Sequence, residues 1–287
     1  MSKLKVETSR QAAAFVRQSL AAPFAVLQEP QTIASLKSAE TVHDLRVATR
    51  TLRTLLKAFR KYFVDQTAVE AIDGQLALID LSLQQVRDAD VMIDWLLTLW
   101  TQAQAEPVDA MQPLLEEVKT KQIADRRALA ASLRSAKIKA ALNQMAGFIV
   151  AAELDDSALA NFKNRLTTQN LRRYKNIAQE MRASGLKKRP ASELHALRIQ
   201  AKEARYLAAA SDNIKGLKLA TDAEEYGKLQ DTLGAHNDLS MLAVWLKVAA
   251  AANAELLKPT VILQEQLVDA QAQQLKALKK LRSNYKK

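Results

Sequence analysis

One stretch, from His43 to Lys57, limits the folds open to this chain more than any other part of it. At ~100° per residue, a helix places every His, Lys and Arg of the stretch within about 80° of one another. Leucines and phenylalanines fall on the opposite side. We therefore predict an amphipathic helix with one apolar face and one basic face. The cations of that face form the first basic stripe, which consists of His43, Arg46, Arg50, Arg53 and Lys57.

The same pattern occurs a second time, 152 residues later. It defines a second basic stripe with matching spacing, except that Ala209 stands where the first stripe has Lys57. Asp88 and Trp95 also have counterparts 150 residues on, in Asp238 and Trp245. These matches predict an internal repeat, with residues 1–152 as the first copy and 153–287 as the second. The cations of the second stripe are His195, Arg198, Lys202 and Arg205.

The composition favours an all-α protein. Only 6 Gly and 6 Pro are present among 287 residues, and Ala, Leu, Gln, Lys and Glu dominate. Each repeat is expected to form a four-helix bundle. Because the bundle core uses the apolar faces, the basic stripes are expected to face solvent or a basic groove between two pseudo-symmetric bundles. Periodicity predicts helices over about 8–28, 41–62, 66–104, 107–150 with a break near 135 or 147, 158–183, 191–211, 217–253 and from 258 onward.

Charge points to an anionic partner. The 42 Lys and Arg exceed the 31 Asp and Glu, which leaves a formal net charge of +11. The absence of cysteine excludes disulfides and Cys-ligated zinc. No signal-peptide core and no long apolar run is present, so a cytoplasmic protein without a membrane span is expected. Further basic residues, most of them seven apart from another cation, are expected at the rim of the groove: Arg17, Arg126, Arg127, Arg134, Arg172 and Arg173.

The histidines and aspartates allow other interpretations. His43 and His195 in equivalent positions could be metal ligands, but the neighbouring cations would repel a divalent metal, so phosphate contacts are the favoured interpretation and no metal is expected. Asp88 and Asp238 are expected to hold stripe arginines in place. No phosphate-binding Gly-rich loop or nucleotide fingerprint is present, which favours a non-enzymatic protein without a cofactor.

Taken together, several segments resemble the CHAD domain, the conserved histidine α-helical domain. The resemblance covers nearly the whole chain, and residues 1–287 are expected to form a single domain of this family. It implies two pseudo-symmetric four-helix bundles with basic grooves, binding of inorganic polyphosphate, and association of bacterial members with polyphosphate granules. It also implies that the groove is lined by His43, Arg46, Arg50, Arg53, His195, Arg198, Lys202 and Arg205. Lys57 and Tyr206, which lie beside these residues in the sequence, are expected to contribute as well. The segments that carry it are His43–Arg53, Val86–Val91, Leu194–Tyr206 and Leu233–Leu239.

Polyphosphate binding is thus the expected function, with two alternatives left open. One is nucleic-acid binding, which usually interleaves aromatic residues for base stacking, whereas aromatics are 5% here. The other is a metal-dependent polyphosphate or triphosphate hydrolase, for which the sequence offers no acidic Mg²⁺ cluster. The oligomeric state is not indicated by the sequence.

Overall fold

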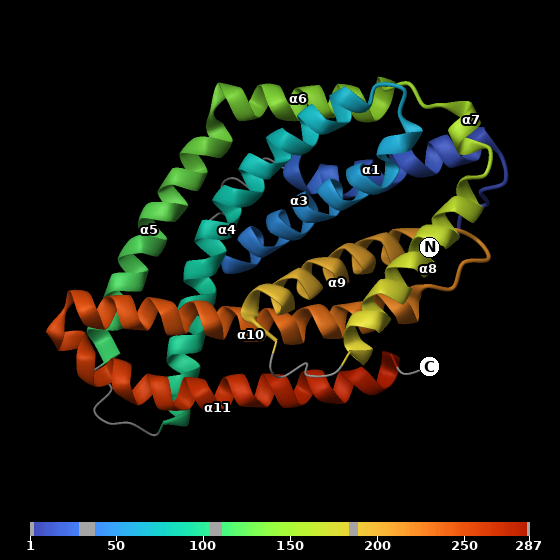
Figure 1. The fold of residues 1–287 in the computed structure, drawn as a ribbon. Helices are drawn as coiled ribbons and strands as arrows, with labels where there is room; N and C mark the ends of the chain where they lie inside the picture. The colour runs from blue at the N-terminus through green and yellow to red at the C-terminus, as the bar shows by residue number, and fades with distance from the viewer. Residues whose placement is uncertain (1–2, 29–37, 104–110, 184–188, 286–287) are drawn as a thin grey trace. The chain divides into compact units, whose positions relative to one another are not determined.

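The computed structural model describes residues 3–28, 38–103, 111–183 and 189–285. Within these ranges the chain is helical and forms no strand; Leu4–Ile214 and Phe63–Leu154 make isolated bridges. The all-α prediction is confirmed (Figure 1). The helices are α1 (Ser9–Gln28), α3 (Ala39–Phe59), α4 (Gln66–Gln102), α5 (Gln112–Arg134), α6 (Ala136–Ala151), α7 (Asp156–Leu159), α8 (Phe162–Arg182), α9 (Ala191–Ser211), α10 (Ala220–Ala252) and α11 (Leu257–Leu281), with 3₁₀ turns at Arg60–Tyr62, Ala254–Leu256 and Arg282–Tyr285.

Capping residues explain two helix boundaries. Ser135 separates α5 from α6, where one break was predicted, and its hydroxyl accepts a hydrogen bond from the backbone of Ile138 at 3.3 Å. The predicted start of the second helix at Thr41 is wrong. The helix begins at Ala39, because the Ser38 hydroxyl caps it by accepting from the backbone of Glu40 at 3.2 Å. Predicted breaks at residues 29–30 and 106–107, and most of the predicted loop 184–190, lie outside the described residues.

The chain divides into two compact units, neither of which is continuous in sequence. Unit 1 comprises residues 1–87, 125–174 and 203–224, and unit 2 comprises 88–124, 175–202 and 225–287. Each unit therefore draws on both predicted repeats, and the long helices α4, α5, α8, α9 and α10 contribute residues to both units. The predicted repeat boundary at residue 152 divides the sequence into two continuous halves, and these halves do not coincide with the two compact units. The internal repeat and the groove between its halves stay predictions.

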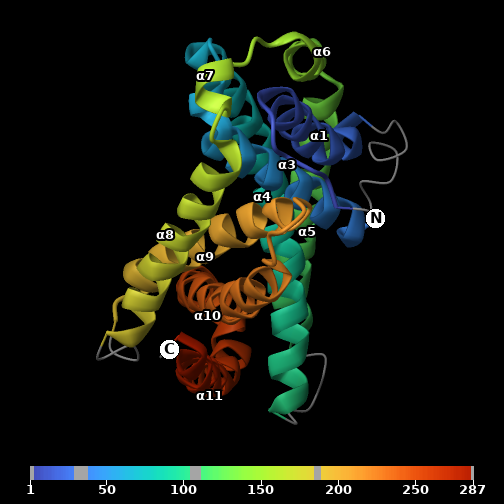
Figure 2. The same ribbon diagram turned by 90° about the vertical axis from the view of Figure 1, so that its right-hand side faces the viewer.

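Unit 1 is built around the apolar face of α3. Its residues Leu52, Leu55, Leu56 and Phe59 are at most 1% exposed, which confirms the apolar face predicted from periodicity. Figures 1 and 2 show α1 and α3 side by side. An aromatic cluster joins them to the start of α8, with ring centroids 6.0 Å apart for Phe59 and Phe162. This packing orients α3, so that its basic stripe points away from the core.

Unit 2 has a core of its own. The α10 and α11 helices lie side by side, as both ribbon views show, and contribute leucines such as Leu242 and Leu263 (Figures 1 and 2). Leu99 and Trp100, near the end of α4, belong to the same core. The second basic stripe begins in this unit, with His195, Arg198 and Lys202, whereas Arg205 belongs to unit 1.

Candidate functional site

The first basic stripe lies on α3, and most of it is covered. The exposed fraction of the side chain is 10% for Arg46, 15% for Arg50 and 24% for Arg53, but 55% for Lys57. His43, at the start of the stripe, is exposed. Of the two placements expected for the stripe, solvent or a groove, full exposure to solvent is therefore excluded for the three arginines. They pack against α4, which presents polar side chains to them.

Asp80 on α4 is the common partner of these arginines. Its Oδ1 lies 3.3 Å from Arg50 Nε and 3.7 Å from Arg46 Nη1, and its Oδ2 lies 3.1 Å from Arg53 Nη1. The Asp80 side chain is 12% exposed, so these interactions are only partly screened by solvent. One carboxylate thus holds three guanidinium groups in place.

Two further residues of α4 complete this polar face. Asp73 Oδ1 lies 2.9 Å from Arg53 Nε, and its other oxygen lies 3.7 Å from Lys57 Nζ. The Gln84 side-chain oxygen accepts hydrogen bonds from Arg46 at 3.2 Å and Arg50 at 3.1 Å. Positions 73, 80 and 84 are seven and four residues apart, which places them on one helix face. That spacing is visible in the sequence and would have predicted one polar face on this helix.

The second half of α9 belongs to the same electrostatic environment. Burial raises the pKa of Tyr206, and the positive charges of three arginines, Arg50, Arg205 and Arg46, oppose that rise. All four residues belong to unit 1. The structure therefore brings Arg205 and Tyr206, from the end of the second stripe, into electrostatic range of the first. That the two stripes act together on one ligand stays a prediction.

The beginning of the second stripe lies against α10. His195 Nδ1 is 3.2 Å from the side-chain oxygen of Asn237. Arg198 lies along the surface of Gly234, where an added Cβ would be 3.4 Å from Arg198 Nε. The same Nε is buried and has no hydrogen-bond acceptor among the described residues. Gly234 thus allows the guanidinium group to lie close to the α10 backbone.

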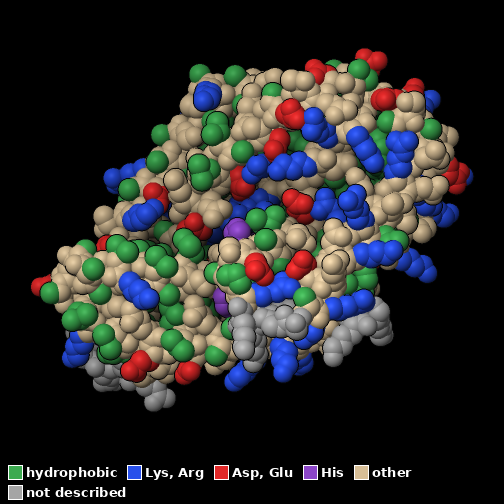
Figure 3. Space-filling model, viewed as in Figure 1, with side chains coloured by type: hydrophobic (Ala, Val, Ile, Leu, Met, Phe, Trp, Pro, Cys, Tyr) green, Lys and Arg blue, Asp and Glu red, His purple; other side chains and the backbone are tan. Residues whose placement is uncertain are grey.

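The residues predicted for the rim fall into two groups. Arg17 donates to three carbonyls at the end of α6, and Arg173 Nη1 pairs with Glu203 at 2.8 Å. Arg126 is half-buried and has an interaction partner. The exposed members are Arg127, Arg134 and Arg172. Figure 3 shows Lys and Arg side chains over α8, the helix that carries Arg172.

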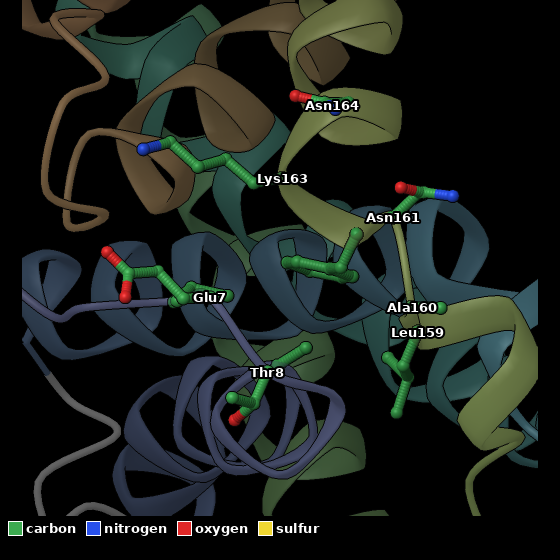
Figure 4. Close-up of a pocket in the computed structure, with 10 residues that line it drawn as sticks. Glu7, Thr8, Leu159, Ala160, Asn161, Lys163 and Asn164 are labelled. Carbon is green, nitrogen blue, oxygen red and sulfur yellow. The ribbon is translucent and has the colours of Figure 1, made fainter.

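A pocket in unit 1 is formed by other residues. It lies between the N-terminal segment and the start of α8, with Glu7, Thr8 and Asn161 among the side chains at its edge (Figure 4). Lys163, which also lines it, donates to the backbone oxygen of Lys215 at 2.9 Å. No stripe residue lines this pocket. Because none of the residues predicted to bind an anion lines this pocket, we place the candidate site on the two basic stripes and not in the pocket.

The described residues contain no group of three or more His, Asp or Glu side chains arranged to hold a metal ion. In the same ranges, no helix combines the length and apolar character that crossing a bilayer requires.

Comparison with known proteins identifies the family. The CHAD domain model matches residues 18–247. The fold is similar to the crystal structure of the CHAD domain from the plant Ricinus communis, with a TM-score of 0.73 and 18% identity, covering 99% of this chain and 93% of that one. It is also similar to PptA from Streptomyces chartreusis, with a TM-score of 0.73 and 16% identity, covering 97% of this chain and 99% of that one. No curated protein matches the sequence. Since the family model spans most of its length, this chain belongs to the CHAD domain family.

Proposed function

We propose that this protein binds inorganic polyphosphate through its two basic stripes and does so without catalysis. Membership of the CHAD domain family supports the proposal, as does the net charge of +11. A linear chain of phosphates carries regularly spaced negative charges, and stripe cations three or four residues apart lie at intervals of about 5–6 Å along a helix. Association with polyphosphate granules in the cytoplasm is the cellular role that we infer from the family resemblance.

One observation carries the proposal most strongly. Arg46, Arg50 and Arg53 are held side by side on α3 by Asp80 and Gln84. Their guanidinium groups are ordered before any ligand arrives, so binding loses less side-chain entropy than it would on a mobile surface. Arginine also donates two parallel hydrogen bonds to one phosphate group.

The most exposed cations of the first stripe are expected to make the first contacts with a long anion. His43 and Lys57 lie at the two ends of the stripe and are open to solvent. Arg205 extends the positive surface within unit 1. The exposed Arg127, Arg134 and Arg172 are retained as peripheral contacts. Arg17 is left out of the proposed surface, because both of its terminal nitrogens donate to backbone carbonyls at the end of α6, which, unlike a side-chain carboxylate, cannot swing away to admit a phosphate. Arg173 pairs with the Glu203 side chain and is retained as a peripheral contact.

The test is a titration of polyphosphates of several lengths against the whole protein. The variant Arg50→Gln with Lys202→Gln removes one cation from each stripe. Lys5→Gln with Arg10→Gln is the matched control, because it removes the same charge from exposed positions outside both stripes. We expect the stripe variant to bind about tenfold or more weakly than the control, and its dependence of log K on log salt to fall by about 0.7 per lost contact. Equal affinity of the two variants would refute the site.

The two alternative functions predict different results when RNA or a divalent metal ion is added to the protein with polyphosphate. Nucleic-acid binding predicts that RNA displaces polyphosphate at physiological salt, and a polyphosphate ligand predicts that it does not. A hydrolase predicts phosphate release when Mg²⁺ or Mn²⁺ is added, and a binding protein predicts none.

A further inference from the structure

We propose that Asp80 is an internal competitor for the anionic ligand. Its carboxylate occupies the position among three arginines that a phosphate group takes when the ligand binds. Asp80 thereby sets the minimum length of polyanion that the protein retains. This inference rests on the proposed binding function and concerns the specificity of the same site.

The geometry of Asp80 is that of a bound anion. Both of its oxygens contact guanidinium groups, and the three contacts come from Arg46, Arg50 and Arg53, at 3.7, 3.3 and 3.1 Å. Carboxylate and phosphate oxygens are interchangeable acceptors for such groups. An external phosphate that engages the same nitrogens must therefore replace this carboxylate.

The contact lengths indicate that replacement is feasible. Charge-assisted N–H···O bonds are ordinarily about 2.7–2.9 Å long. Arg17 and its carbonyl partners lie at 2.7 Å, Arg173 and Glu203 at 2.8 Å, and Arg53 and Asp73 at 2.9 Å. All three contacts of Asp80 are longer than these. One carboxylate divided among three cations makes no single optimal bond, so its guanidinium partners can exchange acceptors.

Competition of this kind discriminates between short and long anions. Asp80 is attached to the protein, so its effective concentration at the arginines exceeds that of a small anion in solution. A short anion gains too few contacts to displace it. Displacing Asp80 costs the same free energy for a long chain as for a short one, but a longer chain also contacts His43, Lys57 and Arg205 along its length. Affinity is therefore expected to rise steeply above a threshold length.

The predicted repeat offers an internal contrast. In the register that pairs Asp88 with Asp238, Asp80 corresponds to Gln230, a neutral residue. The competing carboxylate thus has no counterpart at that position of α10.

The experiment compares Asp80→Asn with Asp44→Asn in the whole protein. Asp44 is exposed on α3 and outside the stripe, so its variant removes the same negative charge without removing a partner of the arginines. Binding of tripolyphosphate and of long-chain polyphosphate is measured by calorimetry at one salt concentration. We expect Asp80→Asn to bind both ligands about fivefold more tightly than Asp44→Asn, since one partly buried ion-pair contact alters an equilibrium by about that factor. The shortest chain that binds should become shorter.

Failure of this inference is distinguishable from failure of the proposed function. If the unaltered protein does not bind long-chain polyphosphate, the proposed function is wrong. If it binds, but Asp80→Asn binds no more tightly than Asp44→Asn, Asp80 serves only to position the arginines and the competitor role is overturned. Should thermal unfolding show that Asp80→Asn is not folded, Asp80→Ser replaces it, since it also removes the carboxylate. The same gain over Asp44→Asn is expected, and no gain would overturn the inference.

Discussion

Substitution of Arg17 tests whether this basic residue stabilises the fold or binds the ligand. The α6 helix ends at Ala151, and the last carbonyls of any helix have no partner within it. Arg17 Nη1 donates to the oxygens of Ile149 and Val150, and Nη2 donates to that of Ala152, each at 2.7 Å. A cation at this end also interacts favourably with the helix dipole. Arg17 therefore attaches α1 to the end of α6.

The variant Arg17→Gln removes these three hydrogen bonds and one positive charge. A hydrogen bond to a charged group contributes about 1.5–3 kcal/mol, but the freed carbonyls near the surface recover part of this from water. We expect a loss of about 2–3 kcal/mol in the free energy of unfolding, including the dipole interaction. At about 2–4 °C per kcal/mol, the melting temperature should fall by roughly 4–12 °C.

Chemical denaturation measures the stability, and a polyphosphate titration on the same samples measures affinity. Arg10→Gln is the matched control, because Arg10 lies on the same helix, is exposed and carries the same charge. We expect Arg17→Gln to be less stable than this control and to bind polyphosphate equally well. A variant with unchanged stability and weakened binding would refute the reasoning and restore Arg17 as a ligand.

Three other predictions concern the stability of unit 1. Burial raises the pKa of Tyr62 from 10.0 to about 12, so the phenol loses its proton at lower pH in the unfolded state than in the folded one. The free energy of unfolding should therefore fall as the pH rises from about 10 to about 12. Tyr62→Phe should make this fall smaller in denaturation measured at several alkaline pH values. Gly74 lies within α4 with open space around it, so Gly74→Ala should stabilise the fold by about 0.5–1 kcal/mol in denaturant melts, and a loss would contradict the helix assignment. The buried Ser211 hydroxyl accepts from Asn170 at 3.0 Å, so Ser211→Ala should cost about 1–2 kcal/mol by leaving that amide partly unpaired, whereas an unchanged melting temperature would refute the pairing.

Helix positions and faces were predictable because they depend on local geometry. The predicted helix 191–211 coincides with α9, and the predicted break at Ser135 separates α5 from α6. The apolar side of α3 is buried as its periodicity required. All of these follow from a rotation of ~100° per residue and from capping chemistry, which act over a few residues.

The partners of the basic stripe were not predictable in the same way. Asp73 and Asp80 lie beside the first stripe, and neither was predicted as a partner of its arginines. The role expected of Asp88 and Asp238 in holding stripe arginines stays a prediction. Several faces of α4 carry acids, and the sequence alone does not say which face turns toward α3.

The sequence by itself determined that this chain is helical, basic and marked by two similar stripes, since composition and periodicity are properties of the chain alone. Only the tertiary structure decided that three arginines of the first stripe are covered and joined by one carboxylate, and that Arg17 caps a helix. Those contacts join residues that are distant in sequence. The packing of the apolar faces selects them, because it rotates each helix until its core side is buried and thereby determines which polar sides meet.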